Sequence, residues 1–227
     1  MNNLSMLFFP VVRVARCAAA TGAALLLCAC ATPVAQMDYT AFRENRPRSI
    51  LVLPPINQSP EVEATASFFA TSTAPLAESG YYVIPVTLAD EAFKQNGVTV
   101  AEEAHAIELG KLREIFGADA ALYVTVTRFG TSYRILSSVV EATASAKLID
   151  LRSGQELWSG QAVVVINNNN SGGGLVGALV GAIVNQIVNT VSDRSHDAAR
   201  MANYQMLSAG RRNSILFGPY HPMSGTD

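Results

Sequence analysis

The first 30 residues decide how much of this chain is available to fold. Arg13 and Arg16 precede an apolar run over residues 17–27, which is too short for the roughly 20 residues that span a bilayer. The run ends in Leu27-Cys28-Ala29-Cys30, the residue order that lipoprotein signal peptidase cleaves. We therefore expect a signal peptide over 1–29, cleavage between Ala29 and Cys30, and lipid on Cys30. An ordinary secretory signal or a buried helix is the weaker alternative.

The acyl chains on Cys30 would hold a water-folded domain at a membrane, because each buried methylene contributes about 0.8 kcal/mol. Ala31 follows the cysteine, and no aspartate stands there to resemble the inner-membrane retention signal of enteric bacteria. We expect an outer-membrane protein whose domain lies in the periplasm, with exposure at the cell surface as an alternative.

Cleavage leaves residues 30–227, enough for one domain with a sizeable core. Cys17 and Cys28 leave with the signal and Cys30 is modified, so no thiol remains for a disulfide, and packing must stabilise the fold. Of the 16 Lys and Arg residues two lie in the signal, against 18 acidic residues, which leaves a net charge of −4. An acidic chain without a basic patch is not expected to bind nucleic acid.

We divide the mature chain into a lipidated tether (30–48), a single α/β domain (49–210) and a C-terminal tail (211–227). The tether shows no clear periodicity and carries Arg43, Arg46 and Arg48. These arginines could contact anionic lipid head groups, but a solvated linker is the favoured interpretation because charged blocks this short are usually just soluble.

The domain begins with an alternation of strands and helices. Residues 49–53 are apolar on both faces and end at Pro54-Pro55, which predicts a central strand covered on both sides. Residues 61–79 predict a helix that Pro75 bends or breaks, and residues 81–86 predict a second strand.

Two further helices are expected before the next strand. The first is capped by Thr87 and stops at Asn96-Gly97. The second is capped by Thr99, carries an apolar stripe and ends at Gly117, and it is the most clearly predicted helix in the chain.

Alternating apolar and polar residues then predict half-exposed strands over 122–127 and 140–148. The second is joined through a turn at 150–155 to a partner over 156–166, an antiparallel hairpin. Trp158 follows this turn and is expected to be a packing anchor rather than part of a binding platform. The expected fold class is therefore α/β, a layered mixed sheet with flanking helices and a long C-terminal helix.

The long helix is expected to cover residues 175–206. Asn185, Gln186 and Asn189 share one narrow arc of it, so the helix is amphipathic rather than membrane-spanning. The candidate helix-packing or dimer edge consists of Gly177, Gly181, Val184 and Val188. Small residues permit close packing against another surface. The domain's own sheet is the favoured surface, a second copy of the chain is the next, and a membrane is the least favoured.

The sequence contains no clear catalytic, cofactor or metal site. Its three histidines, at positions 105, 196 and 221, lack the spacing of a helical metal site, and a solvated face is favoured for His105. Ser195-His196-Asp197 has the residue types of a catalytic triad, but adjacent helical residues cannot converge on one atom. The glycines of residues 167–174 lack the Lys-Ser/Thr ending of a phosphate loop. We expect a non-enzymatic protein without a cofactor.

Three stretches carry a family resemblance: residues 48–59 (RSILVLPPINQS), 74–85 (APLAESGYYVIP) and 148–160 (LIDLRSGQELWSG). They resemble an uncharacterised bacterial lipoprotein family that includes a meningococcal vaccine-candidate lipoprotein. The resemblance implies a fold similar to the amino-terminal domain of TolB and to the periplasmic domain of the curli secretion channel, and a tendency to form homodimers. It implies no established activity. It also implies a place beside a curli-channel-like lipoprotein, although paired amphipathic membrane hairpins are missing, so a pore is not expected.

Three functions remain open after the sequence. The favoured one is a docking or assembly component of the envelope, accessory to a curli-channel-like secretion or transport system. The second is a module that binds a small ligand or an envelope polymer in a cleft near Asn57 and Gln58, at the strand ends. The third is a hydrolase with a dispersed site.

Overall fold

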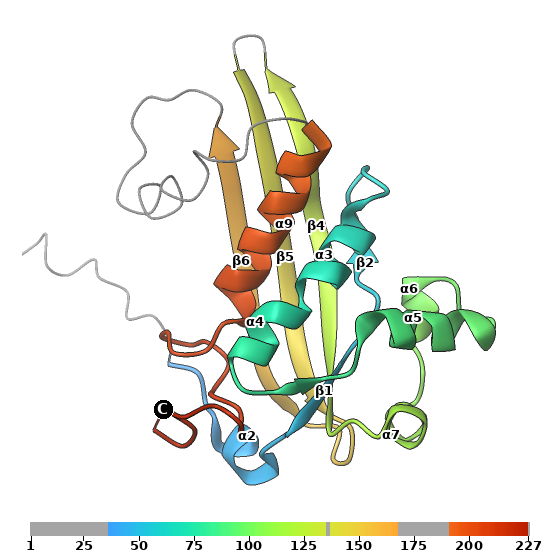
Figure 1. Cartoon of the computed structure of the whole chain (residues 1–227), viewed down its shortest axis with the longest axis vertical. Coiled ribbons are helices and arrows are strands. Elements are labelled where there is room, and N and C mark those ends of the chain that lie inside the picture. The colour runs from blue at the N-terminus through green and yellow to red at the C-terminus, as the bar shows by residue number, and fades with distance from the viewer. Residues whose placement is uncertain (1–35, 135–136, 168–190, 227) are drawn as a thin grey trace, which may run out of the picture. The chain divides into compact units, whose positions relative to one another are not determined.

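The computed structural model describes residues 36–134, 137–167 and 191–226. The chain divides into two units, Met1–Gln36 and Met37–Asp227, and the fold is that of the second unit. The long sheet and the helices on it are shown in Figure 1.

The centre of the fold is a mixed six-stranded sheet. The strands run in the order β3-β1-β4-β5-β6, and β2 pairs with β4 beyond the end of β1. Parallel pairs join β1 to β3 and β4, whereas β4, β5 and β6 are antiparallel neighbours, which confirms the predicted mixed sheet and hairpin. The strand bounds are β1 Ser49–Val52, β2 Ile56–Asn57, β3 Tyr82–Val83, β4 Ala120–Arg134, β5 Ser137–Asp150 and β6 Glu156–Asn167.

Helices flank this sheet, as the fold class predicts. Their bounds are α2 Thr40–Asn45, α3 Ala64–Thr71, α4 Thr73–Glu78, α5 Val86–Gln95, α6 Ala101–His105, α7 Leu109–Phe116 and α9 Val191–Leu207. Figure 1 shows α3 and α9 lying along the long strands, with α5, α6 and α7 grouped beside β1.

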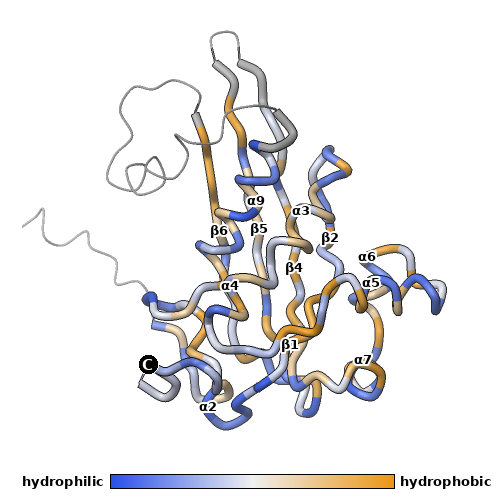
Figure 2. The backbone as a smooth tube through the Cα atoms, in the orientation of Figure 1, coloured by the Kyte–Doolittle hydropathy of each residue, from blue (hydrophilic) through white to orange (hydrophobic). Residues whose placement is uncertain are grey.

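Strand β1 separates two hydrophobic cores. Ile50 and Val52 belong to the larger core with α3 and α9, while Leu51 and Leu53 belong to the smaller core with α5, α6 and α7. Successive side chains of a strand point to opposite faces, so the continuous apolar run fills both cores. The predicted central strand is thus confirmed, and Figure 2 shows the end of β1 as hydrophobic.

Small residues let α9 approach the sheet closely. Ala198, Ala199 and Ala202 of α9 are fully buried, and β5 presents the buried residues Ala142 and Ala144 to the same core. Methyl side chains on both surfaces shorten the distance between two backbones and leave no void. The described part of the long C-terminal helix therefore packs on the domain's own sheet.

The tether and tail boundaries expected from the sequence are wrong within the folded unit. Phe42 of α2 is only 4% exposed and Ile215 is fully buried, and both belong to the larger core. The hydroxyl of Tyr39 donates a hydrogen bond to the carbonyl of Ser214 at 2.5 Å, which joins the two segments. Short irregular segments show no periodic pattern of apolar residues. The sequence therefore could not show that apolar residues of the expected tether and tail complete the larger core.

Several element boundaries also differ from expectation. The predicted helix over 99–117 is two helices, α6 and α7, and it starts after Val100 rather than with a Thr99 cap. Helix α5 likewise follows Pro85, and Thr87 lies inside it. The predicted strand over 81–86 is reduced to β3.

Two predictions about local structure are confirmed. The helix over 61–79 is interrupted at Ser72, three residues before Pro75, because proline is tolerated only in the first turn of a new helix. Trp158 is 2% exposed and its indole Nε1 donates a hydrogen bond to the carbonyl of Asn213, so it is a packing anchor.

Candidate functional site: an apolar groove between α3 and α5

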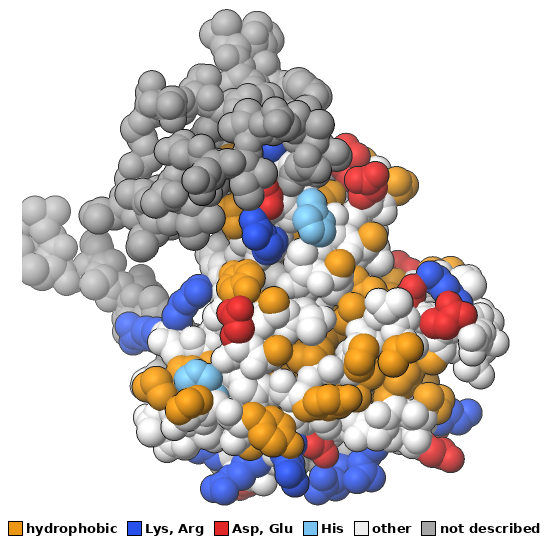
Figure 3. Space-filling view, in the orientation of Figure 1, with side chains coloured by type: hydrophobic (Ala, Val, Ile, Leu, Met, Phe, Trp, Pro, Cys, Tyr) orange, Lys and Arg blue, Asp and Glu red, His pale blue; other side chains and the backbone are white. Residues whose placement is uncertain are grey.

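An open groove of about 590 Å³ lies between α3, α5 and the loop that leads into α6. Its floor and walls are largely apolar, with Ala66 and Phe69 from α3 and Val86 from α5. Val62 lines the groove and is 87% exposed, and Val100 is also exposed. Figure 3 shows hydrophobic side chains gathered on the surface between α3 and α5. Large exposed apolar side chains grouped in a hollow are typical of an interaction site.

The end of β1 explains why the groove forms at this place. Pro54-Pro55 ends the strand because neither proline has an N–H to donate, and the chain turns away from the sheet. The hydroxyl of Thr65 donates to the carbonyl of Pro55 at 3.1 Å, which holds α3 to this bend. The carboxyl ends of parallel strands are the usual place for binding sites in α/β sheets.

Asn57 lies in the groove but its side chain is used to hold the loop. Its Nδ2 donates to the carbonyl of Glu61 at 2.8 Å, and its Oδ1 accepts from the N–H of Ser59 at 2.8 Å. Gln58 is exposed and is not part of the groove lining. The expected position of a cleft at the strand ends thus agrees with the groove, whereas Asn57 has a structural role there.

His105 anchors α6 beside the groove. Its Nε2 lies 3.0 Å from the carbonyl of Pro54, and its ring packs edge-on against Tyr123 with 5.1 Å between centroids. Burial lowers the pKa of His105, and the bond to Pro54 and the charge of Glu102 offset part of that effect. The solvated face expected for this histidine is therefore wrong, because its partner carbonyl lies 51 residues away in the sequence.

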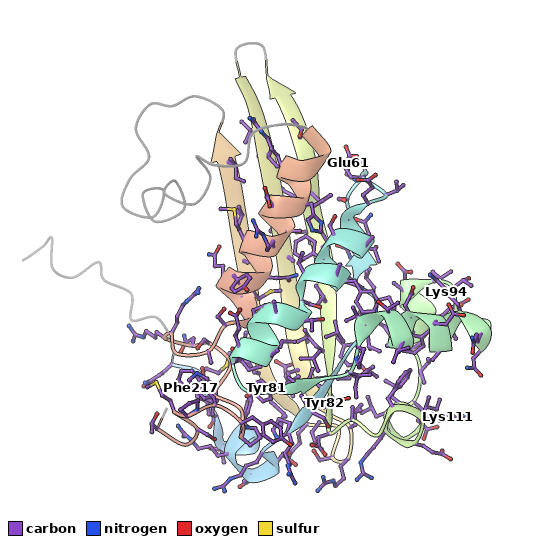
Figure 4. All side chains as sticks on the ribbon, in the orientation of Figure 1. Glu61, Tyr81, Tyr82, Lys94, Lys111 and Phe217 are labelled. Carbon is purple, nitrogen blue, oxygen red and sulfur yellow. The ribbon has the colours of Figure 1, made fainter. Side chains whose placement is uncertain are left out.

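The charged residues that line the groove are Asp90, Lys94 and Glu102, and the sequence that forms its walls is acidic. Residues 61–104 contain seven acidic residues and one lysine. That lysine, Lys94, lies on α5 and forms an ion pair with Asp90 at 2.6 Å, and the carboxylate raises its pKa. Figure 4 labels Glu61 before α3 and Lys94 on α5. An apolar groove with an acidic rim favours an apolar ligand that also carries positive charge.

The described part of the chain contains no cluster of three or more His, Cys, Asp or Glu residues that could hold a metal ion. Ser195, His196 and Asp197 lie on α9, where Ser195 is buried, His196 is exposed and Asp197 pairs with Arg200 at 2.8 Å. Within the same described ranges, no helix is long and apolar enough to cross a membrane.

The lipid-attachment and helix-edge residues predicted from the sequence lie outside the described residues: Ala29, Cys30, Gly177, Gly181, Val184 and Val188. The groove itself was not predicted in detail. In the sequence, Val62 and Val100 look like ordinary apolar residues near helix starts. Their exposure follows from the packing of the neighbouring elements and could not be seen in the sequence.

Comparison with known proteins identifies close relatives. A family profile described as "Putative lipoprotein GNA1162-like" matches residues 37–220. The "Putative lipoprotein NMB1124/NMB1162" of Neisseria meningitidis serogroup B is 51% identical over 198 residues, which cover 87% of this chain and 92% of that protein.

Solved structures are also similar to this chain. The crystal structure of lipoprotein GNA1162 from Neisseria meningitidis is 54% identical, with a TM-score of 0.54, and the match covers 63% of this chain and all of that one. The PelC dodecamer from Paraburkholderia phytofirmans is 14% identical, with a TM-score of 0.42, over 77% of this chain and 91% of that one. The extent of the family match and the identity to the meningococcal protein show that this chain belongs to the GNA1162-like family of lipoproteins.

Proposed function

We propose that this lipoprotein is an adaptor of the bacterial envelope that binds a segment of a partner protein in the groove between α3 and α5. The anchor would be lipid on Cys30, placed at the outer membrane with the domain in the periplasm. The groove is the observation that carries the proposal: it has a volume of about 590 Å³, is largely apolar, and is not covered by any of the described residues. The role would be assembly or secretion, accessory to a curli-channel-like lipoprotein, without catalysis.

The chemistry of the groove defines the partner segment. Exposed Val62 and Val100 would be buried by apolar side chains, at about 25 cal/mol per Å² of apolar surface. Asp90 and Glu102 line the groove beside Lys94, and residues 61–104 as a whole carry seven acidic residues and one lysine, which favours a segment flanked by Lys or Arg. An amphipathic helix with a basic polar face fits both requirements, because helices commonly bind by laying their apolar face in such grooves.

A small ligand is the second candidate. The volume of the groove falls within the range of about 300–1,000 Å³ that is usual for small-molecule pockets. Thr65 and Thr87 supply hydroxyls among the apolar lining residues. An apolar ligand with a cationic group would use the same acidic rim.

Site-specific photo-crosslinking in intact cells tests the docking function. A photoreactive amino acid at Val62 or Val100 lies in the groove, whereas the same amino acid at Ile115, exposed on α7, lies outside it. We expect one envelope protein to be captured from both groove positions and not from position 115. Adducts only with a second copy of this chain, or equal adducts from position 115, would contradict the proposal.

A groove-filling variant gives the matched control. Ala66→Trp places an indole in the groove, and Ala77→Trp places the same side chain on the exposed surface of α4, outside the groove. The crosslink from Val62 should disappear with Ala66→Trp and persist with Ala77→Trp. Native mass spectrometry of the purified protein separates the two functions, because a bound small molecule lost only in Ala66→Trp would favour the ligand function.

A further inference from the structure

Positive charge is concentrated at the two ends of the folded chain. Residues 37–48 and 208–226 contain five arginines and two acidic residues, a net charge of +3. Residues 49–207 contain nine basic and fifteen acidic residues, a net charge of −6. The folded chain is acidic as a whole, but these two short segments carry a net positive charge.

The two basic segments form one surface in the folded protein. The backbone N–H of Met37 donates to Oδ1 of Asn213 at 3.1 Å, next to Arg211 and Arg212. A cavity of about 340 Å³ lies between the segments and is lined by Arg43 and Arg46 from one and Phe217 from the other. Figure 4 shows Tyr81 and Phe217 at the end of the molecule where α2 lies. We call this surface, formed by residues 37–48 and 208–226, the terminal face.

Several arginines of the terminal face are available to an external anion. Arg46, Arg48 and Arg212 are exposed, and none of them forms an ion pair with a carboxylate among the described residues. Lys94, Arg128 and Arg200, elsewhere in the domain, each pair with an acidic side chain. The Nε of Arg46 donates to the carbonyl of Arg43 at 3.0 Å. Exposed guanidinium groups that are not paired with an internal carboxylate are suited to bidentate contacts with phosphate.

The position of the anchor brings the terminal face close to a membrane. Only six residues separate Cys30 from Met37, and the seven steps of a fully extended chain at about 3.6 Å each cover at most roughly 25 Å. If lipid is attached at Cys30, as the proposed function requires, Met37 and the arginines beside it cannot leave the neighbourhood of the bilayer surface.

We propose that the terminal face lies on the anionic phospholipid surface of the membrane that holds the anchor, with Arg46, Arg48 and Arg212 contacting lipid phosphates. The acidic rim of the groove would be repelled by the same surface. No residue of the terminal face lines the groove, so docking on lipid leaves the groove uncovered for its partner. The arginines thus orient the domain, in addition to the acyl chains that retain it.

Vesicle flotation with the unlipidated protein tests the terminal face separately from the anchor. The probe is the mature chain, residues 30–227, with Cys30→Ser, mixed with vesicles of phosphatidylcholine alone or of equal phosphatidylcholine and phosphatidylglycerol. We expect flotation with the anionic vesicles only, and release by salt. A Lys or Arg residue near an anionic surface changes binding about five-fold, so Arg46→Gln, Arg48→Gln and Arg212→Gln together should weaken it about a hundred-fold.

A matched triple variant controls for net charge. Lys94→Gln, Arg128→Gln and Arg200→Gln change the charge by the same amount outside the terminal face, and should leave anionic vesicle binding within a few-fold of the parent. Equal loss in both triples, or equal flotation with neutral vesicles, would overturn the proposal. Inhibition by millimolar inorganic phosphate at constant ionic strength would also overturn it, in favour of a free-anion site. Thermal melting of each triple confirms that it folds.

Orientation on the membrane provides a second readout. The Cys30→Ser mature chain has no thiol, so single cysteines can be introduced and labelled. A fluorophore on Tyr220→Cys, in the terminal face, should be quenched by a lipid-borne quencher more strongly than one on Leu88→Cys beside the groove; both parent residues are exposed. Equal quenching would overturn the orientation. Groove crosslinking can fail while vesicle binding persists, so this result is independent of the docking function.

Discussion

Asn203 of α9 is a buried polar residue that ties two helices together. Its Nδ2 donates to the carbonyl of Phe68 and to Oγ1 of Thr71, both at 2.8 Å, and its side chain is fully buried. Both partners lie at the end of α3, where backbone carbonyls lack helical partners. The residue therefore fixes the position of α3, which forms one wall of the groove.

We expect Asn203→Ala to lower the free energy of unfolding by about 1–3 kcal/mol, because a buried carbonyl loses its donor. Chemical denaturation of the Cys30→Ser mature chain measures this change. Gln205→Ala, an exposed position on the same helix, should have little effect. Equal stability of the two variants would show that the contacts of Asn203 do not stabilise the fold.

His105 should make stability depend on pH. Its pKa in the folded protein lies below the ordinary value of 6.5, chiefly because it is buried, so folding favours the neutral ring. The unfolded state binds a proton first as the pH falls, and the free energy of unfolding should therefore be constant above about pH 6.5 and decrease below it. Denaturation curves between pH 5 and 8 measure the decrease.

Two substitutions test whether His105, rather than another histidine, causes the decrease in stability. His105→Gln should flatten the decrease, whereas His196→Gln, at an exposed position on α9, should retain it. A decrease of the same size in His105→Gln would assign the pH dependence to other groups.

At the scale of elements, the C-terminal segment is held against the loop between α4 and β3. The N–H of Gly218 donates to the carbonyl of Ser79 at 2.8 Å, and that of Tyr220 to the carbonyl of Gly80 at 3.1 Å. The hydroxyl of Tyr81 donates to the carbonyl of Leu216 at 2.5 Å. The segment forms an integral layer of the fold rather than a tail.

Gly218→Ala should destabilise this layer. A Cβ at this position would overlap the carbonyl oxygen of Gly80, and backbone atoms cannot move aside as a flexible side chain would. Overpacking of this kind costs about 1–3 kcal/mol, and the melting temperature should fall by several degrees. Gly110→Ala in α7 meets no atom within 4 Å and should be neutral or slightly stabilising. An unchanged melting temperature for Gly218→Ala would show that the segment detaches easily.

At the scale of the whole molecule, anchor and terminal face should act together on membrane association. Cys30→Ser is expected to move the protein from the membrane fraction to the soluble fraction after a wash in 1 M salt, because salt screens the remaining arginine contacts. Cys28→Ser, within the signal, should leave the protein in the membrane fraction. Fractionation and immunoblotting measure both. Retention of Cys30→Ser after the salt wash would place the anchor elsewhere in the chain.

The sequence predicted the elements that have a strong local pattern. The central strand at 49–53 and the antiparallel hairpin around 150–155 are both present. Both could be predicted because a strand buried on two faces is continuously apolar and a half-exposed strand alternates apolar and polar residues. The helix at 99–117 was predicted as one element and is two, because the backbone leaves the helical conformation between Ala106 and Glu108, where the apolar stripe continues without a break signal. The groove could not be predicted, because exposure of Val62 depends on what packs beside it.

Residue order alone thus determined the signal motif, the α/β class, the mixed sheet and the family resemblance, since each rests on local composition, spacing or periodicity. Only the tertiary structure decided that residues 37–48 and 211–226 belong to the fold and that the two segments contact each other. It alone also decided that α3 and α5 leave an apolar groove between them. These features depend on contacts between residues far apart in the chain, such as Met37 with Asn213 and His105 with Pro54, which no local pattern records.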